Sequence, residues 1–219
     1  MYVLDADVFI QAKRLHYGMD FAPGFWRWLE SEAEGDVVRS IESVYDEIAD
    51  HGDDLAEWVR GPGRPMFLDV DEDVVARTRD VAAWVAAHPA KPFKKNAFLS
   101  GADPFVVATG LARGWTVVTQ EVSAGNKGDL KIPDACKALG VSCVNTFALM
   151  RARGVRLVLS PAGGGGTVDV DGQGSGPRIR PVVGDQLREE GDLLVTPRTG
   201  ARIDDMVVSD LIDAERYGG

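Results

Sequence analysis

The chain is poor in the residues that mark secreted and membrane proteins. Its 219 residues include only two cysteines, Cys136 and Cys143, so a disulfide framework is not expected, and the lack of nearby histidines argues against a zinc site. No apolar run approaches the roughly 20 residues that a membrane helix requires. The first residues carry two acids and no basic leader, unlike a signal peptide. We therefore expect a cytoplasmic protein with no membrane partner, in which both cysteines are small buried hydrophobic side chains.

Positive charge is also scarce. The 24 lysines and arginines against 34 acidic residues give a formal net charge of −10, which argues against broad electrostatic binding to nucleic acid. A nuclease is still compatible with this charge, because metal-binding carboxylates add acid to such a site. The three histidines, His16, His51 and His88, show no catalytic spacing. Their scatter favours a water activated by a metal over one activated by a histidine base.

The composition changes near residue 160. From there to the end lysine is absent, large apolar side chains are sparse, and 12 of the 25 glycines occur. We expect a folded domain at 1–159, a glycine-rich linker at 160–177 and an extended, poorly structured tail at 178–219. Within the tail, residues 206–212 predict a small amphipathic helix that docks on a partner surface.

The first 159 residues alternate between short β-prone runs and amphipathic helical stretches. Strands are expected at 2–4, 37–41, 115–119 and 141–144, with 66–70 a strand or an extended connector and 155–159 a last edge strand. Helices are expected at 8–15, 25–35, 53–59, 74–87, 103–113, 133–139 and 146–153, with one more ending at residue 50. This β-α-β-α order predicts an α/β fold with a central parallel sheet and helices on both faces.

Two aspartates, Asp5 and Asp7, follow the first predicted strand directly. The carboxyl ends of parallel strands are where ligands gather in α/β sheets. Two like charges placed there repel each other unless a cation or a proton lies between them. Either aspartate could instead cap the helix that follows. The pair alone leaves both interpretations open.

Four acids lie at the ends of separate predicted elements: Asp5, Glu47, Asp103 and Glu121. Converging carboxylates are the ligands that Mg²⁺ and Mn²⁺ require, and such an ion can activate water and stabilise charge in a phosphodiester displacement. Each acid alone has a plainer explanation. Glu47 could lie on a solvated helix face, Asp103 could cap a helix before Pro104, and Glu121 could belong to a turn. Their order and common location favour a metal site.

The segments around these acids resemble a known family. The segments are Leu-Asp-Ala-Asp at 4–7, Ser-Val-Tyr-Asp-Glu at 43–47, Ala-Asp-Pro-Phe at 102–105 and Val-Val-Thr-Gln-Glu at 117–121. They are similar to the PIN-domain nucleases. Together with Pro-Gly-Phe-Trp at 23–26 and Lys-Ile-Pro-Asp-Ala-Cys at 131–136, they are similar more narrowly to the PIN-like subfamily DUF4411. The resemblance covers residues 1–159.

This resemblance implies a PIN-like three-layer α/β/α fold and an Mg²⁺- or Mn²⁺-dependent ribonuclease. By resemblance Asp5, Glu47 and Asp103 bind the metal, and Glu121 takes the fourth acidic position. The hydroxyl of Thr119 then lies near the metal. Many bacterial members are VapC-like toxins of type II toxin–antitoxin systems and frequently form homodimers, so an RNA substrate, a cognate antitoxin and a homodimer are implied as well.

The chain departs from the PIN pattern at two positions. Many PIN domains have asparagine where this chain has Asp7, which leaves Asp7 a supporting role. Many also have aspartate where this chain has Glu121, and the longer side chain could shift or weaken a second metal. Asp129 and Asp134 are close enough in sequence to substitute for Glu121.

Two other functions remain open. The order Asp5-Ala6-Asp7 after a strand also matches the opening motif of haloacid-dehalogenase-type phosphatases, in which the first aspartate is a nucleophile. That interpretation leaves Glu47 and Asp103 without a role. The second alternative is a catalytically weakened PIN-like module, damaged at Glu121, that only binds a partner.

Two further sets of residues are candidates for binding. In a predicted loop, Lys91, Lys94 and Lys95 could bind RNA by charge and the neighbouring Phe93 by stacking, although an ordinary solvated loop would look the same.

The tail resembles the flexible segment of Phd-type antitoxins. By that resemblance an arginine enters the acidic site and displaces the metal, and the candidates are Arg198, Arg202 and Arg216. A tail of this kind would inhibit its own or a neighbouring chain.

Overall fold

A computed structural model describes residues 1–125 and 128–157, together with the backbone of 188–190 and 193–195. The chain divides into two compact units, Met1–Pro177 and Arg178–Gly219. Among the described residues, no helix combines the length and apolarity that crossing a membrane requires. All residues predicted to form the metal site lie in the first unit.

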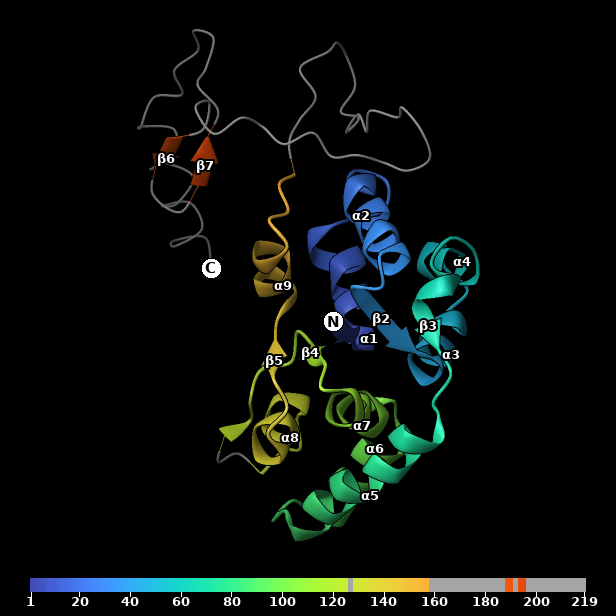
Figure 1. Cartoon of the computed structure of the whole chain (residues 1–219), viewed down its shortest axis with the longest axis vertical. Helices are drawn as coiled ribbons and strands as arrows, with labels where there is room; N and C mark the ends of the chain where they lie inside the picture. The colour runs from blue at the N-terminus through green and yellow to red at the C-terminus, as the bar shows by residue number, and fades with distance from the viewer. Residues whose placement is uncertain (126–127, 158–187, 191–192, 196–219) are drawn as a thin grey trace, which may run out of the picture. The chain divides into compact units, whose positions relative to one another are not determined.

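A parallel sheet of five strands forms the centre of the first unit, in the order β3-β2-β1-β4-β5 (Figure 1). The strands are β1 (Tyr2–Leu4), β2 (Val38–Ile41), β3 (Phe67–Leu68), β4 (Thr116–Val118) and β5 (Cys143–Val144). Because β1 is the middle strand, its apolar residues Val3 and Leu4 are fully buried. The expected central parallel sheet is therefore confirmed, although several strands are shorter than predicted.

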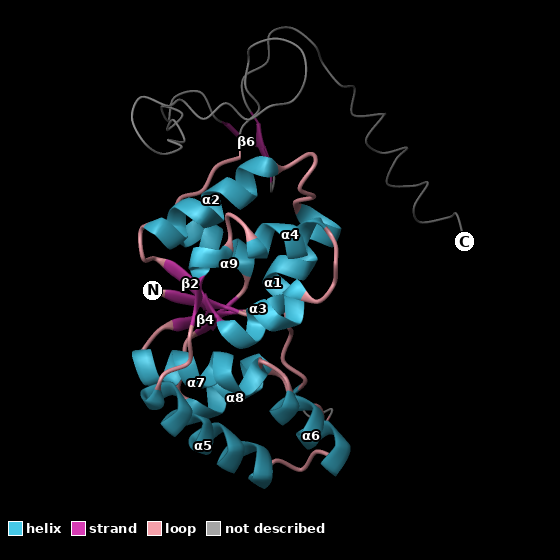
Figure 2. Cartoon of the chain, turned by 90° about the vertical axis from the view of Figure 1, so that its right-hand side faces the viewer, coloured by secondary structure: helices cyan, strands magenta, loops and turns pink. Residues whose placement is uncertain are grey.

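Helices connect the strands and cover both faces of the sheet. They are α1 (Ala6–Gln11) with a π-helical extension at Ala12–His16, α2 (Pro23–Glu34), α3 (Glu42–Ala49), α4 (Asp54–Arg60), α5 (Glu72–Ala87), α6 (Pro92–Ser100), α7 (Asp103–Arg113), α8 (Ile132–Leu139) and α9 (Thr146–Ala152), with a 3₁₀ turn at Arg64–Met66. Figure 2 shows α2, α4 and α9 on one side of the sheet and α5, α7 and α8 on the other. The expected three-layer arrangement is confirmed.

Two predictions, one about a loop and one about an edge strand, are wrong. Residues 91–96 are not a loop, because α6 begins at Pro92. Proline suits the first position of a helix, where its missing N–H would have had no partner. Further along α6, Phe98 packs on Trp84 of α5, with the ring centroids 5.9 Å apart. In addition, residues 155–157 belong to no strand, and the rest of the predicted edge strand lies outside the described residues.

The aromatic core joins α1 to the outer elements through Phe9. This side chain is fully buried, and its ring centroid lies 6.1 Å from Trp58 of α4 and 5.7 Å from Phe67 of β3. Aromatic pairs at these distances contribute beyond the apolar area that they bury. Phe9 therefore anchors the helix that directly follows Asp5.

Replacing Phe9 by alanine is expected to lower the free energy of unfolding by about 3–5 kcal/mol, because a buried ring is lost and a cavity remains. Phe93→Ala is the control. Its side chain is 64% exposed, so its change should stay within about 0.5 kcal/mol. Urea denaturation measures both variants, and equal losses would contradict the packing described here.

The second unit contains a strand pair that the sequence analysis did not anticipate. β6 (Arg188–Glu190) pairs antiparallel with β7 (Leu193–Val195). The predicted linker, the helix at 206–212 and the remainder of the tail lie outside the described residues. Those predictions stay untested.

Candidate metal centre

The site begins at the carboxyl ends of β1 and β4, which lie side by side. The N–H of Asp5 donates to the carbonyl of Val118 (3.0 Å), and the N–H of Thr119 donates to the carbonyl of Val144 (3.1 Å). These bonds bring the residue after β1 and the residue after β4 to the same edge of the sheet. Asp5 is 4% exposed and Thr119 is 1% exposed. A carboxylate and a hydroxyl are thus buried together at the edge where α/β sheets bind ligands.

The two aspartates have different partners. Asp5 caps α1, because its Oδ1 accepts from the N–H of Ala6 (2.8 Å). Asp7 caps no helix, so that interpretation of Asp7 is wrong. It lies in the first turn of α1, and its Oδ1 accepts from the N–H of Gln120 (2.9 Å) after β4.

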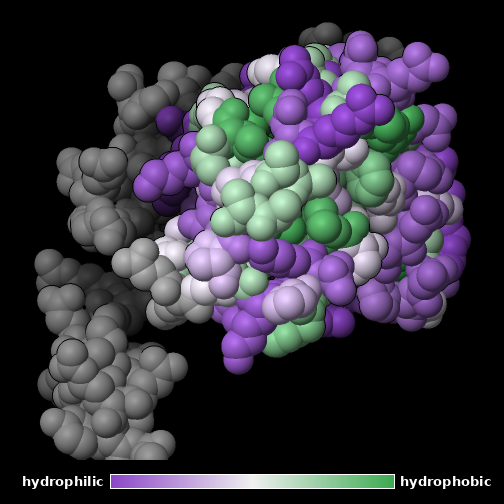
Figure 3. Space-filling model, turned by 90° about the horizontal axis from the view of Figure 1, so that it is seen from below, coloured by the Kyte–Doolittle hydropathy of each residue, from purple (hydrophilic) through white to green (hydrophobic). Residues whose placement is uncertain are grey.

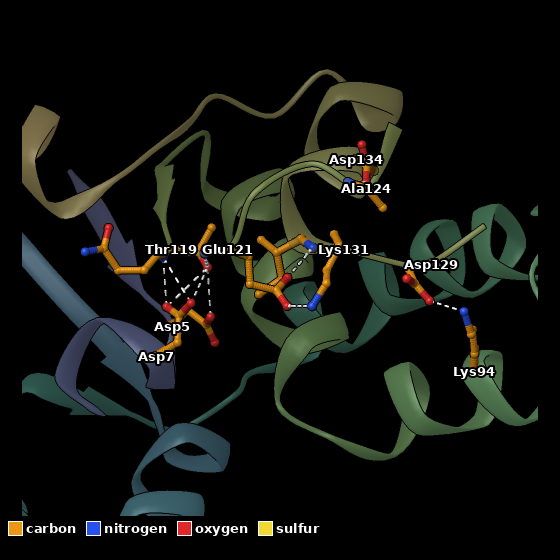
Figure 4. A network of polar contacts seen from close by, with 11 residues as sticks. Asp5, Asp7, Lys94, Thr119, Glu121, Ala124, Asp129, Lys131 and Asp134 are labelled. Atoms are coloured by element: carbon orange, nitrogen blue, oxygen red, sulfur yellow. Dashed lines mark hydrogen bonds and ion pairs between the residues drawn. The ribbon is translucent and has the colours of Figure 1, made fainter. Parts of the chain in front are cut away.

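Thr119 links these two carboxylates. Its hydroxyl lies 3.0 Å from Asp5 Oδ2 and 3.2 Å from Asp7 Oδ1, and it donates its single proton to one of them at a time. It also accepts from the N–H of Glu121 (3.1 Å). Figure 4 shows the three side chains pointing toward one another, with Glu121 beside them. Thr119 therefore holds both aspartates in place from the neighbouring strand.

All of the predicted metal-binding acids line one open pocket of about 400 Å³. The lining residues are Asp5, Ala6, Asp7, Ile10, Gln11, Glu47, Asp103, Glu121 and Lys131. The acids come from the end of β1, from α1, α3 and α7, and from the loop after β4. The structure thus brings together five carboxylates that are widely separated in the sequence.

Asp103 enters the pocket because it does not cap its helix. The prediction of an N-cap is wrong, since the cap residue is Ala102 and makes no side-chain cap bond. Asp103 is instead the first residue of α7, ahead of Pro104. In α3, Glu47 lies in the same helix as the buried Val44 and Ile48, and it is exposed to solvent while it also lines the pocket. Both carboxylates are left available for a ligand.

The pocket raises the pKa values of Asp5, Asp7, Glu47 and Asp103. Burial, with the nearby charges of Asp7 and Asp103, holds the pKa of Asp5 well above the usual aspartate range. Burial and the charges of Glu121 and Glu47 raise the pKa of Asp103 to about 6. Burial raises the pKa of Asp7 even though the Gln120 N–H favours its ionised form, and burial also raises the pKa of Glu47. A bound cation would reduce the repulsion between these carboxylates and favour their ionised forms.

The donor chemistry fits a hard divalent ion. The pocket offers carboxylate oxygens from five residues and neither histidine nor cysteine, which is the ligand preference of Mg²⁺ and Mn²⁺. The acids converge as the walls of a pocket. Across residues 1–125 and 128–157, no three acidic, histidine or cysteine side chains form a ready-made coordination set. A bound ion would therefore draw these side chains inward.

Comparison with known proteins places the chain in a family. A family profile described as "Domain of unknown function (DUF4411)" matches residues 2–157. The chain belongs to the DUF4411 family. This confirms the predicted membership of DUF4411, and the match ends near the predicted end of the first domain. A search of curated proteins finds no match.

Two solved structures are similar to this DUF4411 protein at low identity. One is VapBC2 from Rickettsia felis bound to a DNA fragment from their promoter, with 10% identity, a TM-score of 0.43, and coverage of 66% of this chain and 97% of that chain. The other is FitAcB from Neisseria gonorrhoeae, with 19% identity, a TM-score of 0.42, and coverage of 67% and 99%.

The DUF4411 pocket contains a cation that the sequence analysis missed, Lys131. Its ammonium forms an ion pair with Glu121, whose Oε2 also accepts from the N–H of Ile132 (2.9 Å). The alternation of apolar and charged residues at 130–132 could have indicated its position. Leu130 and Ile132 are both buried, and the lysine between two buried apolar residues is turned away from the core and into the pocket.

The acids considered as substitutes for Glu121 are held elsewhere. Asp134 accepts from the N–H of Ala124 (2.8 Å) and from the hydroxyl of Ser123. Asp129 pairs with Lys94, apart from the acidic cluster in Figure 4. Neither residue lines the pocket.

The lysines predicted to bind RNA lie at the start of α6, outside the pocket lining. Lys95 donates to the carbonyl of Ala86 (2.7 Å), and Lys94 is paired as described. Helices α5 and α6 lie at the lower end of Figure 1, and Figure 3 shows apolar and polar surface interspersed on the face seen from below. RNA contact by Lys91, Lys94 and Lys95 stays a prediction. The tail arginines Arg198, Arg202 and Arg216 lie outside the described residues.

Proposed function

We propose that this protein is an Mg²⁺- or Mn²⁺-dependent endoribonuclease and the toxin of a type II toxin–antitoxin system. The observation that carries the proposal is the gathering of five carboxylates in one open pocket, where the pKa values of Asp5, Asp7, Glu47 and Asp103 are raised. Such a cluster is costly to keep without a cation. Perturbed acids in a cleft are also typical of catalytic sites. The resemblance of the surrounding segments to PIN nucleases supplies the reaction type.

Each residue of the pocket has a role in this proposal. Asp5, Glu47 and Asp103 would hold the ion, which when bound supplies Lewis acidity for activating water and for neutralising charge on the phosphodiester. Thr119 orients Asp5 by its hydroxyl. Asp7, held by the N–H of Gln120, keeps the negative potential of the pocket high and supports the site from the second position of α1.

The direct test is cleavage of total RNA by the purified protein with Mg²⁺ or Mn²⁺ and, in parallel, with a chelator. We expect cleavage only with the metal, since a cluster of acids alone would repel the phosphate. Cleavage of equal extent in the chelator would contradict the proposal. Tight, metal-independent binding of a partner without any RNA cleavage would favour the interaction module.

Hydrolysis of a small phosphomonoester tests the phosphatase alternative. Asp5 would be the nucleophile in that alternative, with its Oδ1 accepting from the N–H of Ala6 and its Oδ2 within hydrogen-bond distance of the Thr119 hydroxyl. That alternative leaves Glu47 and Asp103 unexplained in the same pocket. Hydrolysis of p-nitrophenyl phosphate that is lost in Asp5→Asn would support it over the nuclease.

The proposed toxin needs a partner that holds it inactive, either a separate antitoxin or the chain's own tail. Arg198, Arg202 or Arg216 would enter the acidic pocket and compete with the metal. A chain truncated after Leu159 tests this hypothesis. We expect its RNA cleavage and Mn²⁺ affinity to rise, and unchanged values would contradict self-inhibition. Sedimentation of the same two chains tests the proposed homodimer.

A further inference from the structure

The pocket holds one built-in positive charge beside its acids. Lys131 is the cationic residue among those that line it, and its ammonium is paired with Glu121. The side chain of Lys131 is 39% exposed and that of Glu121 is 20% exposed, so the pair lies at the pocket wall with access to solvent. Figure 4 shows Lys131 directed at Glu121, next to the cluster of Asp5, Asp7 and Thr119.

Glu121 is held by two donors at once. Its Oε1 accepts from the Lys131 ammonium, and its Oε2 accepts from the N–H of Ile132, the first residue of α8. The start of a helix favours a negative charge, which strengthens this arrangement. A divalent cation beside Glu121 would be repelled by the Lys131 ammonium, so this ion pair disfavours a metal at that position. The other pocket acids have no lysine or arginine partner among the ion pairs of the described residues.

The lysine is held in position by its neighbours. Leu130 is 8% exposed and Ile132 is fully buried, so the backbone on both sides of Lys131 is anchored in the core. The side chain therefore starts from a fixed position at the pocket wall, and its ammonium is paired with Glu121. This distinguishes Lys131 from Lys94, which pairs with Asp129 outside the pocket.

We propose that the Lys131 ammonium takes the place of a second divalent cation at Glu121, so that the protein binds one metal ion per chain. The single ion is held by Asp5, Glu47 and Asp103, and Lys131 neutralises the Glu121 side of the pocket toward the substrate phosphate. This inference rests on the proposed metal-dependent function. It assigns to Glu121 a lysine partner in place of the metal expected from sequence.

The test counts bound Mn²⁺ by equilibrium titration, with free Mn²⁺ measured by electron paramagnetic resonance. We expect one ion per wild-type chain and two per chain of Lys131→Gln, because the neutral side chain releases Glu121 for an additional ion. The double variant Lys131→Gln/Glu121→Gln should return to one. Lys137→Gln is the matched control, since Lys137 is an exposed lysine on the same helix, and it should bind one.

Glu121→Gln in the presence of Lys131 gives a second, independent answer if Lys131→Gln does not fold. We expect it to bind one ion, because Asp5, Glu47 and Asp103 are unchanged, with a weaker affinity because the Lys131 charge is no longer balanced by Glu121. Two ions in the wild type, one ion in a folded Lys131→Gln, or two ions in Glu121→Gln would each overturn the inference. Because these readouts count metal, a protein that binds Mn²⁺ as expected but leaves RNA intact would refute the nuclease and not the role of Lys131.

Discussion

Asp5→Asn is expected to reduce metal-dependent RNA cleavage by at least about 10³-fold, because a buried ligand is replaced by a neutral amide of the same shape. Metal ions contribute several kcal/mol to such reactions, and each 1.36 kcal/mol is a factor of ten in rate. The amide oxygen can still accept from the N–H of Ala6, and the amide NH₂ can donate to the Thr119 hydroxyl, so the local fold should persist. Gel electrophoresis of a defined RNA measures the rate, and circular dichroism checks the fold.

Asp50→Asn is the matched control for this experiment. Asp50 is an exposed carboxylate at the end of α3, outside the pocket lining. Its loss should leave the cleavage rate within about twofold of wild type, since surface substitutions away from a site have small effects. Cleavage by Asp5→Asn at the Asp50→Asn rate would refute the assignment of Asp5 to the metal centre.

In the metal-free chain, stability should fall as the pH rises from about 4 to about 6. The pKa of Asp103 is raised from 3.8 to about 6, so between these values the folded state holds more protons than the unfolded state. The free energy of unfolding then decreases with pH, by up to about 3 kcal/mol for this group at 1.36 kcal/mol per pH unit. Asp5, Asp7 and Glu47 have pKa values shifted in the same direction.

Asp103→Asn should remove this part of the pH dependence and make the metal-free protein more stable than wild type at pH 7. Urea denaturation in a chelator, at pH values from 4.5 to 7.5, measures both chains. Adding Mn²⁺ should stabilise wild type more than the variant, because the ion binds the folded state through Asp103. Parallel stability curves for the two chains would contradict the raised pKa.

The loss of stability at neutral pH also explains why the acids are arranged as they are. A cluster that destabilises the empty fold but binds a cation couples metal binding to folding stability. The network of Thr119 with Asp5 and Asp7 offsets part of the repulsion through hydrogen bonds. The two aspartates at the strand ends are therefore tied to the neighbouring strand through Thr119, while Glu47 and Asp103 line the same pocket.

Much of the site could be predicted from local sequence, because strand ends are local features. The apolar run before Asp5 and the run before Thr119 predict buried parallel strands, and the register of β1 with β4 then places both residues at one edge. Asp103 also lies at the end of a predicted element, and the resemblance around Ala102 and Pro104 assigns it to the metal. Its local pattern left a helix cap open as well, and the structure excludes that role because the cap residue is Ala102.

Other features depend on contacts between segments distant in sequence. The partner of Asp7 is the N–H of Gln120, more than one hundred residues away, so a helix cap looked equally reasonable. The helix at 92–100 is stabilised by packing of Phe98 on Trp84, which a basic, proline-containing segment does not reveal. Burial in three dimensions, not composition, decided both.

The sequence by itself determined the order of strands and helices, the family and the acids at the element ends, because apolar periodicity and short motifs are encoded locally. Only the tertiary structure decided which charges meet. It brought Lys131 into the acidic pocket and paired it with Glu121, because the buried Leu130 and Ile132 direct the side chain between them outward. Two charges form an ion pair when they lie close together in space. The number of residues between them in the sequence does not determine that distance.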